Sequence, residues 1–484
     1  MSILMNAMQA DVNKSSYTDN GALTNTSTLD NVLDFFFVGP VAKKNPKDAV
    51  NLFQTAYHTD REKALRTLLW LRDARKGAGA RQAFRDCFAW LMDYDANAAI
   101  AVLDKTAFVG RWDDVFVGLF SKNKNVQNHV IDLVRDALFN KKDALCAKWA
   151  PRRGPIAAAL RSQLGLSPKA YRKLIVELSK TVETQMCANE WDEINYSHVP
   201  SVAYARYRKA FKKHDETRFN DFVNAAVKGE VKVNASAIYP HDVVKGLSDS
   251  PYYVNSIADS KAIDAQWKNL PNYMEDGDNV LVVADTSGSM SVPVSGSTTA
   301  LHVCIALAMY MAERSTGIFK DKFVTFSNRP SIQSLTGTSI VDRYNQLLKA
   351  DWDYNTNLQA VFDLVLYTAV TNGISEDEMP STILIMSDME FDVATGSAHN
   401  QKTTNFDEIR KKYANAGYKM PRLVFWNLNG RMGNMPATKH DKDVALVSGF
   451  SPIILESIFK SESLTPISVM LQTIMNERYD LQLD

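Results

Sequence analysis

The chain has 484 residues, of which 45% are hydrophobic and 23% charged, and its acidic and basic side chains balance to a net charge of zero. This composition is typical of a soluble globular protein with two or three domains. A net charge of zero excludes long-range attraction of the whole protein to nucleic acid or membranes, so any basic surface that binds them must be local. The longest apolar stretch, residues 303–312, is too short to span a membrane. Four scattered cysteines favour reduced thiols and a cytoplasmic location.

The first part of the chain is predicted to be helical. Residues 1–28 are rich in Asn, Ser and Thr, lack a secretory pattern and are expected to form a flexible arm. A helical period then dominates residues 29–247, with helix starts at Pro46, after Asp60 and at Pro168. Helices joined by short polar turns predict stacked antiparallel pairs, an α-solenoid of the HEAT-like kind.

The last part of the chain is predicted to be an α/β domain. Residues 248–277 have the composition of a connector, and residues 278–484 alternate strand and helix patterns. Strands are expected at 279–285, 323–326, 382–388, 423–428 and 444–447. The alternation predicts a doubly wound, mostly parallel sheet covered by helices on both faces. A final helix over 466–478 is expected to pack on the sheet or to return to the solenoid.

Polar side chains are placed where oxygen ligands of a metal would be needed. The pentapeptide 285–289 closes the first apolar strand, Thr356 precedes a helical stretch, and a Ser-Asp pair ends the strand at 382–388. Carboxyl ends of parallel strands meet at one edge of a sheet. Hard oxygen ligands suit Mg²⁺ or Mn²⁺. The candidate metal ligands in the pentapeptide are Asp285, Ser287 and Ser289. The alternative is that the hydroxyls only cap a helix and satisfy a turn.

These three loops resemble the metal-ion-dependent adhesion site of von Willebrand factor A (vWA) domains, and the resemblance adds Thr356 and Asp388 to the candidate metal ligands. The resemblance implies that Ser287, Ser289 and Thr356 hold the cation through hydroxyls, while Asp285 and Asp388 act mostly through water. It also implies an open coordination position that accepts a carboxylate from a protein partner.

The helical part carries a second resemblance, to the TROVE module of Ro-type ribonucleoproteins. More closely, it is similar to an uncharacterised family of phage, bacterial and plant proteins that joins this module to a vWA domain. The matching stretches are residues 71–81, 110–114, 147–152, 171–173, 199–201 and 210–219. The resemblance implies a helical ring closed by the vWA domain, which binds single-stranded ends of structured or misfolded non-coding RNA.

Charge supports the RNA prediction independently. Between residues 141 and 180, ten basic side chains face two acidic ones, an excess of eight, and a second basic cluster at 206–213 is interleaved with Tyr204, Tyr207 and Phe211. Cations beside aromatic faces are typical of single-strand binding. A solvated helix face with acidic partners elsewhere is the alternative. The RNA-binding candidates are Lys141, Lys142, Lys148, Arg152, Arg153, Arg161, Lys169, Arg172, Lys173, Arg206, Arg208, Lys209, Lys212 and Lys213.

The sequence therefore predicts a non-catalytic RNA-binding scaffold with a divalent-metal docking site. The alternative is a metal-dependent protein–protein adaptor without RNA. A metal-dependent nuclease that uses Asp285 and Asp388 is less favoured, because such enzymes hold their metals through several direct carboxylates. The stretch 110–114 is expected to be structural, with Trp112 filling a gap between helix pairs.

Overall fold

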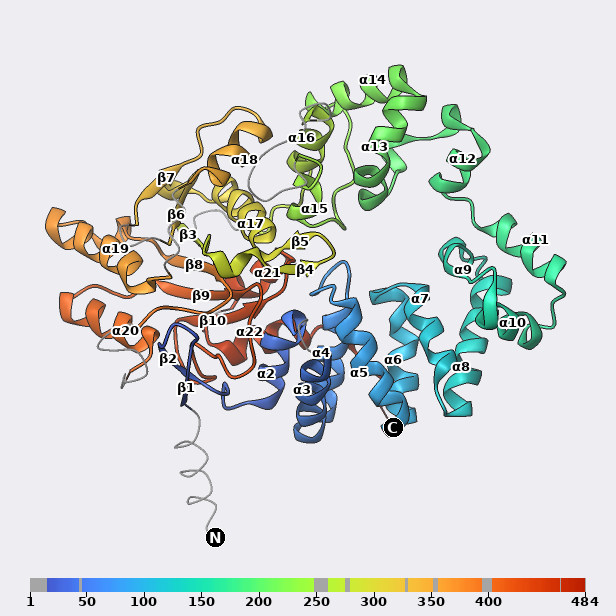
Figure 1. The fold of residues 1–484 in the computed structure, drawn as a ribbon, viewed down its shortest axis with the longest axis horizontal. Helices are drawn as coiled ribbons and strands as arrows, with labels where there is room; N and C mark the ends of the chain where they lie inside the picture. Colours follow the sequence, from blue (N-terminus) through green and yellow to red (C-terminus); the bar gives the residue numbers. More distant parts are fainter. Residues whose placement is uncertain are drawn as a thin grey trace, which may run out of the picture. The chain divides into compact units, whose positions relative to one another are not determined.

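The computed structural model describes residues 15–42, 46–247, 260–274, 279–326, 330–350, 356–393, 403–461 and 463–483. Half of the expected connector 248–277, residues 248–259 and 275–277, lies outside the described residues. The chain divides into two compact units (Figure 1). We call Met1–Asp48 with Tyr239–Thr473 the sheet unit, and Ala49–Ile238 with Ile474–Asp484 the helical unit.

The sheet unit is built on six strands in the order β10-β9-β8-β3-β6-β7. Five are parallel, and β7 pairs antiparallel with β6 at the edge, so the sheet is mixed. Every residue of β3 and β8 is buried, which means that both faces of the central strands are covered. The strands are β3 (Val280–Ala284), β6 (Lys322–Thr325), β7 (Ile332–Ser334), β8 (Thr382–Ser387), β9 (Arg422–Asn427) and β10 (Val444–Ser448).

Helices cover this sheet. The helix α17, which packs on β3, buries nearly its whole length because apolar residues surround it on all sides. The predicted last helix is shorter than expected, since it ends at Ile474 and is followed by the separate turn η9 (Glu477–Tyr479). The helices are α2 (Asn31–Val38), α15 (Pro240–Val244), α16 (Ser260–Lys268), α17 (Ala300–Arg314), α18 (Ile340–Leu348), α19 (Leu358–Asn372), α20 (Asn405–Ala416), α21 (Ile454–Phe459) and α22 (Pro466–Ile474).

The amino-terminal segment belongs to the sheet unit. The strands β1 (Ser15–Tyr17) and β2 (Leu23–Asn25) form an antiparallel hairpin, and Asn25 exchanges two backbone hydrogen bonds with Met435. The helix α2 then packs against β10. Over residues 15–28 this differs from the expected flexible arm, whose residues 1–14 lie outside the described residues, and it also differs from the expected start of the helical domain at residue 29. The reason is that the apolar side chains of α2 are buried in the sheet unit, which a helical period alone does not reveal.

The helical unit contains consecutive helices that pack on their neighbours, as in α4 with α5, α5 with α6 and α13 with α14. Asp60 caps α4 through a 3.0 Å bond from the Lys63 amide, and Ser167 caps α11, which confirms both predicted helix starts. The helices are α3 (Pro46–Thr59), α4 (Arg61–Arg72), α5 (Arg81–Tyr94), α6 (Ala96–Val109), α7 (Trp112–Val115), α8 (Lys124–Arg135), α9 (Ala144–Trp149), α10 (Gly154–Gln163), α11 (Pro168–Leu178), α12 (Val182–Ala188), α13 (Ser201–His214) and α14 (Glu216–Val227).

The stretch 110–114 is structural. Asp114 is fully buried, and its two carboxylate oxygens accept bonds from two guanidinium groups, at 2.6 Å from Arg72 and 2.7 Å from Arg85. Gly110 is required beside this cluster, because a Cβ there would lie 2.9 Å from both Arg72 Nε and Asp114 Oδ2. Trp112 is buried and donates to Asp143 at 3.0 Å. The cluster therefore joins α4, α5 and α7.

Asp73 fixes the carboxyl-terminal tail within the helical unit. This buried carboxylate accepts hydrogen bonds from the Arg75 and Lys76 amides, from Arg478 and from the Tyr479 hydroxyl at 3.1 Å. Burial, followed by the charge of Asp73, raises the pKa of Tyr479, so its hydroxyl remains a donor. A single buried carboxylate thus joins the end of α4 to the tail.

We expect Asp73→Asn to release this tail. The substitution removes the negative charge that accepts hydrogen bonds from the Arg478 guanidinium, from two backbone amides and from the Tyr479 hydroxyl. Each hydrogen bond to a charged group contributes about 1.5–3 kcal/mol. Limited trypsin digestion should then cut after Arg478 several-fold faster than in the wild type. Asp480→Asn is the matched control, since its 2.7 Å pair with Arg66 is half exposed and should contribute little. Equal digestion of Asp73→Asn and wild type would contradict the anchoring role.

No helix in the described part of the chain is both long and apolar enough to cross a membrane.

Candidate metal centre and basic surface

Asp285 lies at the carboxyl end of β3 and is fully buried. One of its carboxylate oxygens accepts the Ser287 amide at 2.9 Å, and the other accepts the Ser387 hydroxyl at 2.6 Å. Each oxygen of Asp285 therefore accepts a hydrogen bond from a neighbouring residue. This arrangement suits a carboxylate that acts on a cation indirectly.

The hydroxyls of Ser287 and Ser289 lie 3.0 Å apart in the turn that follows β3. Ser287 is buried, whereas Ser289 is exposed. The structure thus brings three of the five predicted ligands together: one buried carboxylate and a hydroxyl pair that reaches from the interior to solvent.

Asp388 follows β8, the strand beside β3, and is buried. Its Oδ1 accepts the Glu390 amide at 3.3 Å. Burial and the nearby charge of Asp388 raise the pKa of Asp285 to about 7, against the opposing hydrogen bonds from Ser387 and Ser287. Two buried carboxyl groups therefore face each other closely enough to compete for ionisation.

Thr356 is attached to the loop that follows Asp388. Its hydroxyl lies 2.8 Å from the Glu390 carbonyl and 2.9 Å from Asp392 Oδ1, and it can donate to only one of them. It also accepts a bond from Asn20 at 2.9 Å. A hydroxyl has two acceptor lone pairs, so one remains for a cation. Asn355, the residue before Thr356 in the predicted motif, lies outside the described residues.

The amino-terminal hairpin contacts the same loop. The Asn20 amide donates to Thr356 and to the Glu390 carbonyl at 2.8 Å, and the Asp19 amide donates to Glu390 at 2.7 Å. Thr18 donates to the Phe391 carbonyl at 2.8 Å. Sequence reasoning missed this contribution, because the residues are more than 330 positions apart and carry no shared motif.

Ser387 is the other residue that sequence reasoning did not assign. It stands inside the predicted Ser-Asp pair and is fully buried, and its hydroxyl orients Asp285 rather than facing solvent. The sequence signal that could have identified Ser387 is its position at the end of a parallel strand, directly before Asp388. Among the described residues, no cluster of three or more His, Cys, Asp or Glu side chains forms.

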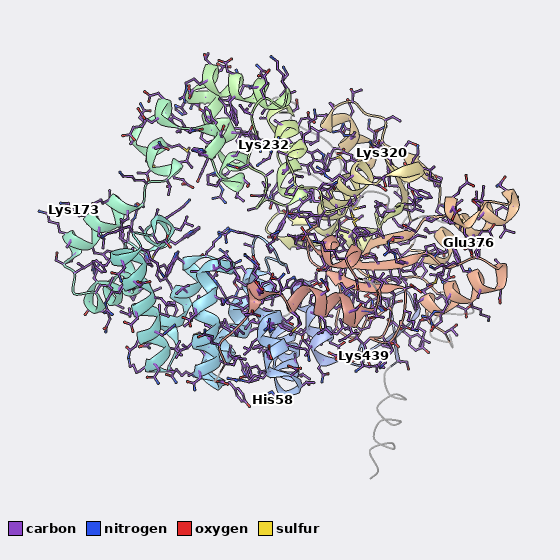
Figure 2. The ribbon with its side chains drawn as sticks, turned by 180° about the vertical axis from the view of Figure 1, so that it is seen from behind. His58, Lys173, Lys232, Lys320, Glu376 and Lys439 are labelled. Carbon is purple, nitrogen blue, oxygen red and sulfur yellow. The ribbon has the colours of Figure 1, made fainter. Side chains whose placement is uncertain are left out.

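Most of the predicted RNA-binding cations are exposed on the helical unit. On α11, Lys169, Arg172 and Lys173 are exposed at helical spacing, whereas Tyr171 and Ile175 are buried. Lys173 is labelled on this helix in Figure 2. The remaining exposed candidates are Lys141, Lys142, Arg152, Arg153, Arg206, Lys209 and Lys213, and the half-buried ones are Lys148, Arg161 and Lys212.

Two of these cations are already paired with acids. Lys141 lies 2.7 Å from Asp136, and Lys148 lies 2.9 Å from Glu183. Within the described ranges, by contrast, no carboxylate oxygen lies within 4.0 Å of the side-chain nitrogens of Lys169, Arg172 or Lys173. The α11 cations are therefore among the predicted cations that are available to an external anion.

The structure corrects the prediction at α13. Arg208 is buried, and its guanidinium donates to the Ala205 carbonyl at 2.8 Å, so it cannot contact an RNA phosphate on the surface. Tyr204 and Phe211, expected as base-stacking faces, are buried in an aromatic cluster with Phe219. The interleaving of aromatic and basic residues on this helix reflects a buried and an exposed face.

Comparison with known proteins shows similarity along almost the whole chain. Residues 279–478 match a family model described as a domain of unknown function, DUF7788, and residues 18–111 and 160–279 match a second, DUF2828. The chain is 29% identical over 514 residues to the uncharacterized protein L728 of Acanthamoeba polyphaga mimivirus, covering 95% of this chain and 87% of that protein. It is also similar to the crystal structure of the Deinococcus radiodurans RO (RSR) protein, at 13% identity and a TM-score of 0.36, covering 91% of this chain and 93% of that one.

Proposed function

We propose that this protein is a non-catalytic RNA-binding scaffold with a Mg²⁺ or Mn²⁺ docking site of the vWA kind at the end of β3 and β8. The observation that carries the metal site is the buried pair Asp285 and Asp388 beside the 3.0 Å hydroxyl pair of Ser287 and Ser289. Two buried carboxyl groups are stable together only when a proton or a cation offsets their charge.

The donor set favours docking over catalysis. In this proposal the hydroxyls of Ser287, Ser289 and Thr356 are direct ligands, and the carboxylates act through water. Both Asp285 oxygens already accept bonds from the protein, which supports this division of roles. With few negative charges on it, the cation retains affinity for one more anionic oxygen. A carboxylate of a protein partner would supply that oxygen.

RNA binding in this proposal rests on the exposed cations of the helical unit. Lys169, Arg172 and Lys173 place three charges on one face of α11 against one acidic residue, Glu177. Such a face binds phosphates without regard to sequence, because the affinity comes largely from counterion release. Because Tyr204 and Phe211 of α13 are buried, they cannot stack on RNA bases. We therefore expect electrostatic attraction to phosphates to supply most of the RNA affinity.

We therefore expect Arg172→Glu with Lys173→Glu to weaken binding of single-stranded RNA and to flatten its salt dependence. Removing two phosphate contacts should lower the slope of log affinity against log salt by about 1 to 2. Fluorescence anisotropy with a labelled RNA at several salt concentrations measures both effects. Lys320→Glu with Lys411→Glu is the control of equal charge change, since both lysines are exposed in the sheet unit.

Each alternative has a distinct outcome in these assays. An adaptor without RNA predicts no salt-dependent RNA binding by the wild type, together with metal-dependent capture of an acidic protein. A nuclease predicts metal-dependent RNA cleavage that Asp388→Ala abolishes. Equal RNA binding by the α11 variant and the control would remove α11 from the interface.

A further inference from the structure

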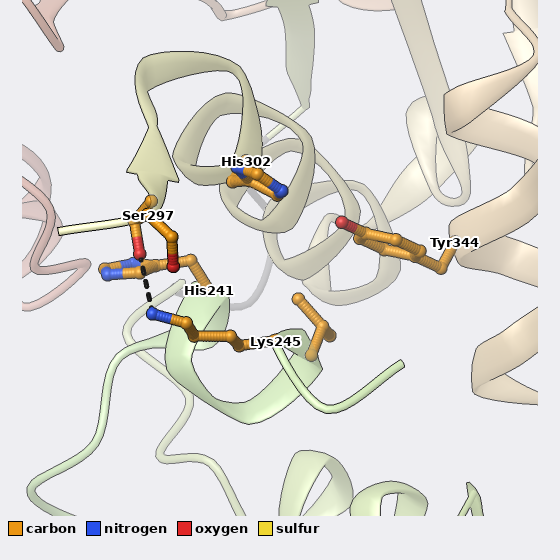
Figure 3. Close-up of a pocket in the computed structure, with 7 residues that line it drawn as sticks. His241, Lys245, Ser297, His302 and Tyr344 are labelled. Atoms are coloured by element: carbon orange, nitrogen blue, oxygen red, sulfur yellow. Dashed lines mark hydrogen bonds between the residues drawn. The ribbon is translucent and has the colours of Figure 1, made fainter. Parts of the chain in front are cut away.

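A separate cavity of about 120 Å³ lies within the sheet unit, beside the amino terminus of α17 (Figure 3). Its polar lining comes from α15 and the residue after it, from the turn before α17, from α17 itself and from α18. The polar residues that line it are His241, Lys245, Ser297, Thr298, His302 and Tyr344. None of them belongs to the candidate metal centre.

Tyr344 supplies a buried hydrogen-bond donor to this cavity. The residue is 1% exposed, and its hydroxyl has no hydrogen-bond partner among the residues that the structure describes. Figure 3 shows the hydroxyl pointing away from α18 towards His302. Burial raises the pKa of Tyr344, so the hydroxyl keeps its proton. The Tyr344 hydroxyl can therefore donate a hydrogen bond to a molecule in the cavity.

His302 contributes a ring whose protonation is set by its neighbours. The Thr299 amide donates to His302 Nδ1 at 3.1 Å, so Nδ1 is an acceptor and the neutral ring carries its proton on Nε2. Thr299 is also the N-cap of α17, a helix of 15 residues. The positive end of the helix dipole therefore lies beside the cavity.

Lys245 adds a full positive charge. Its ammonium donates to the Thr298 hydroxyl at 3.2 Å, the bond drawn in Figure 3, and the side chain is exposed at the cavity mouth. Among the described residues close to the lining, Asp242 is acidic, and its Oδ1 lies 3.8 Å from His241 Nε2. None of the described residues that line the cavity carries a carboxylate. The lining therefore offers donors and positive charge, which disfavours a metal cation and favours an anion.

We propose that this cavity binds a phosphate group, with Tyr344 and Lys245 as its principal donors. Its volume is well below the roughly 300–1,000 Å³ of ordinary ligand pockets and is sufficient for a phosphate group. The phosphate is either free inorganic phosphate or the terminal phosphate of a nucleic acid chain. The phosphate group offers the same oxygen acceptors in both cases. The remainder of the nucleic acid chain would lie outside the cavity.

Isothermal titration of the full chain with inorganic phosphate tests the site. We expect Tyr344→Phe, which removes only the hydroxyl, and Lys245→Gln each to weaken binding about 10- to 100-fold. Tyr367→Phe and Lys320→Gln are the matched controls, because both side chains are exposed elsewhere in the sheet unit, and they should bind as the wild type does. A circular dichroism spectrum identical to the wild type establishes that Tyr344→Phe is folded.

A second arm separates the two sources of phosphate. A 5′-phosphorylated trinucleotide is compared with the same trinucleotide ending in a 5′-hydroxyl. Preference for the phosphorylated form that disappears in Tyr344→Phe supports a nucleic acid end, and phosphate binding without that preference supports the free ion. If neither probe binds, or if both variants bind as tightly as the wild type, the proposal is wrong. These measurements need neither Mg²⁺ nor the α11 cations, so their failure is distinguishable from failure of the proposed function.

Discussion

Replacing Asp114 with alanine is expected to destabilise the helical unit by about 3–5 kcal/mol, the range typical of breaking a buried ion pair. The carboxylate is fully buried, and its two oxygens serve Arg72 and Arg85 at 2.6 and 2.7 Å. Removing it leaves Arg72, itself 2% exposed, without its charge partner in the interior. Urea denaturation followed by far-ultraviolet circular dichroism should show the midpoint of the helical unit shifted to lower urea.

Asp113→Ala is the matched control, because the same chemical change is made one residue away. Asp113 is 23% exposed on its side chain and pairs with Arg85 at 3.0 Å and Arg81 at 3.5 Å. Partly exposed pairs contribute about 1 kcal/mol or less. The shift for Asp113→Ala should therefore be a small fraction of that for Asp114→Ala. Equal shifts would mean that burial of the Asp114 carboxylate does not set its contribution.

The local elements of the fold were predictable because their signals are local. A capping side chain such as Asp60 or Ser167 accepts a hydrogen bond from an amide within three residues. The apolar run of β3 predicts a buried strand without knowledge of which strands pair with it. The hairpin over residues 15–25 was not predictable, since its stability comes from Met435, Glu390 and Thr356, which no sequence period connects to it. Similarly, the sequence does not show that the phenylalanines of α2 are buried in the core of the sheet unit, so the unit to which α2 belongs was not predictable.

The candidate metal site was predictable in part for a related reason. Asp285, Ser287 and Ser289 fall within five positions, and strand ends bring Asp388 to the neighbouring strand. The role of Ser387 depends on the direction of one hydroxyl, which the sequence does not carry. The aromatic residues of α13 were misassigned because a helix with one buried face and one basic face alternates in the same way as a base-stacking platform.

The substitution Asp285→Asn is expected to reduce stabilisation by Mg²⁺ strongly, which tests the metal centre directly. Loss of a carboxylate that orients metal ligands typically costs about 10- to 100-fold in metal affinity. At a Mg²⁺ concentration 100 times the wild-type Kd, the wild type gains about 2.7 kcal/mol, and a variant with 100-fold weaker affinity gains about 0.4 kcal/mol. Thermal unfolding with and without Mg²⁺ measures the difference. Asp377→Asn, an exposed position in the same unit, should respond to Mg²⁺ as the wild type does.

The pH dependence gives the same site a second signature. Because the pKa of Asp285 is raised in the folded protein from 3.8 to about 7, the folded state binds more protons than the unfolded state between these values. The metal-free wild type should therefore lose stability as pH rises through this window and level off above it. Mg²⁺ must displace the proton, so its apparent affinity should increase from pH 6 to pH 8. Asp285→Asn cannot titrate, and both trends should flatten. A metal response in Asp285→Asn that equals the wild-type response, or that weakens as pH rises, would place the cation elsewhere.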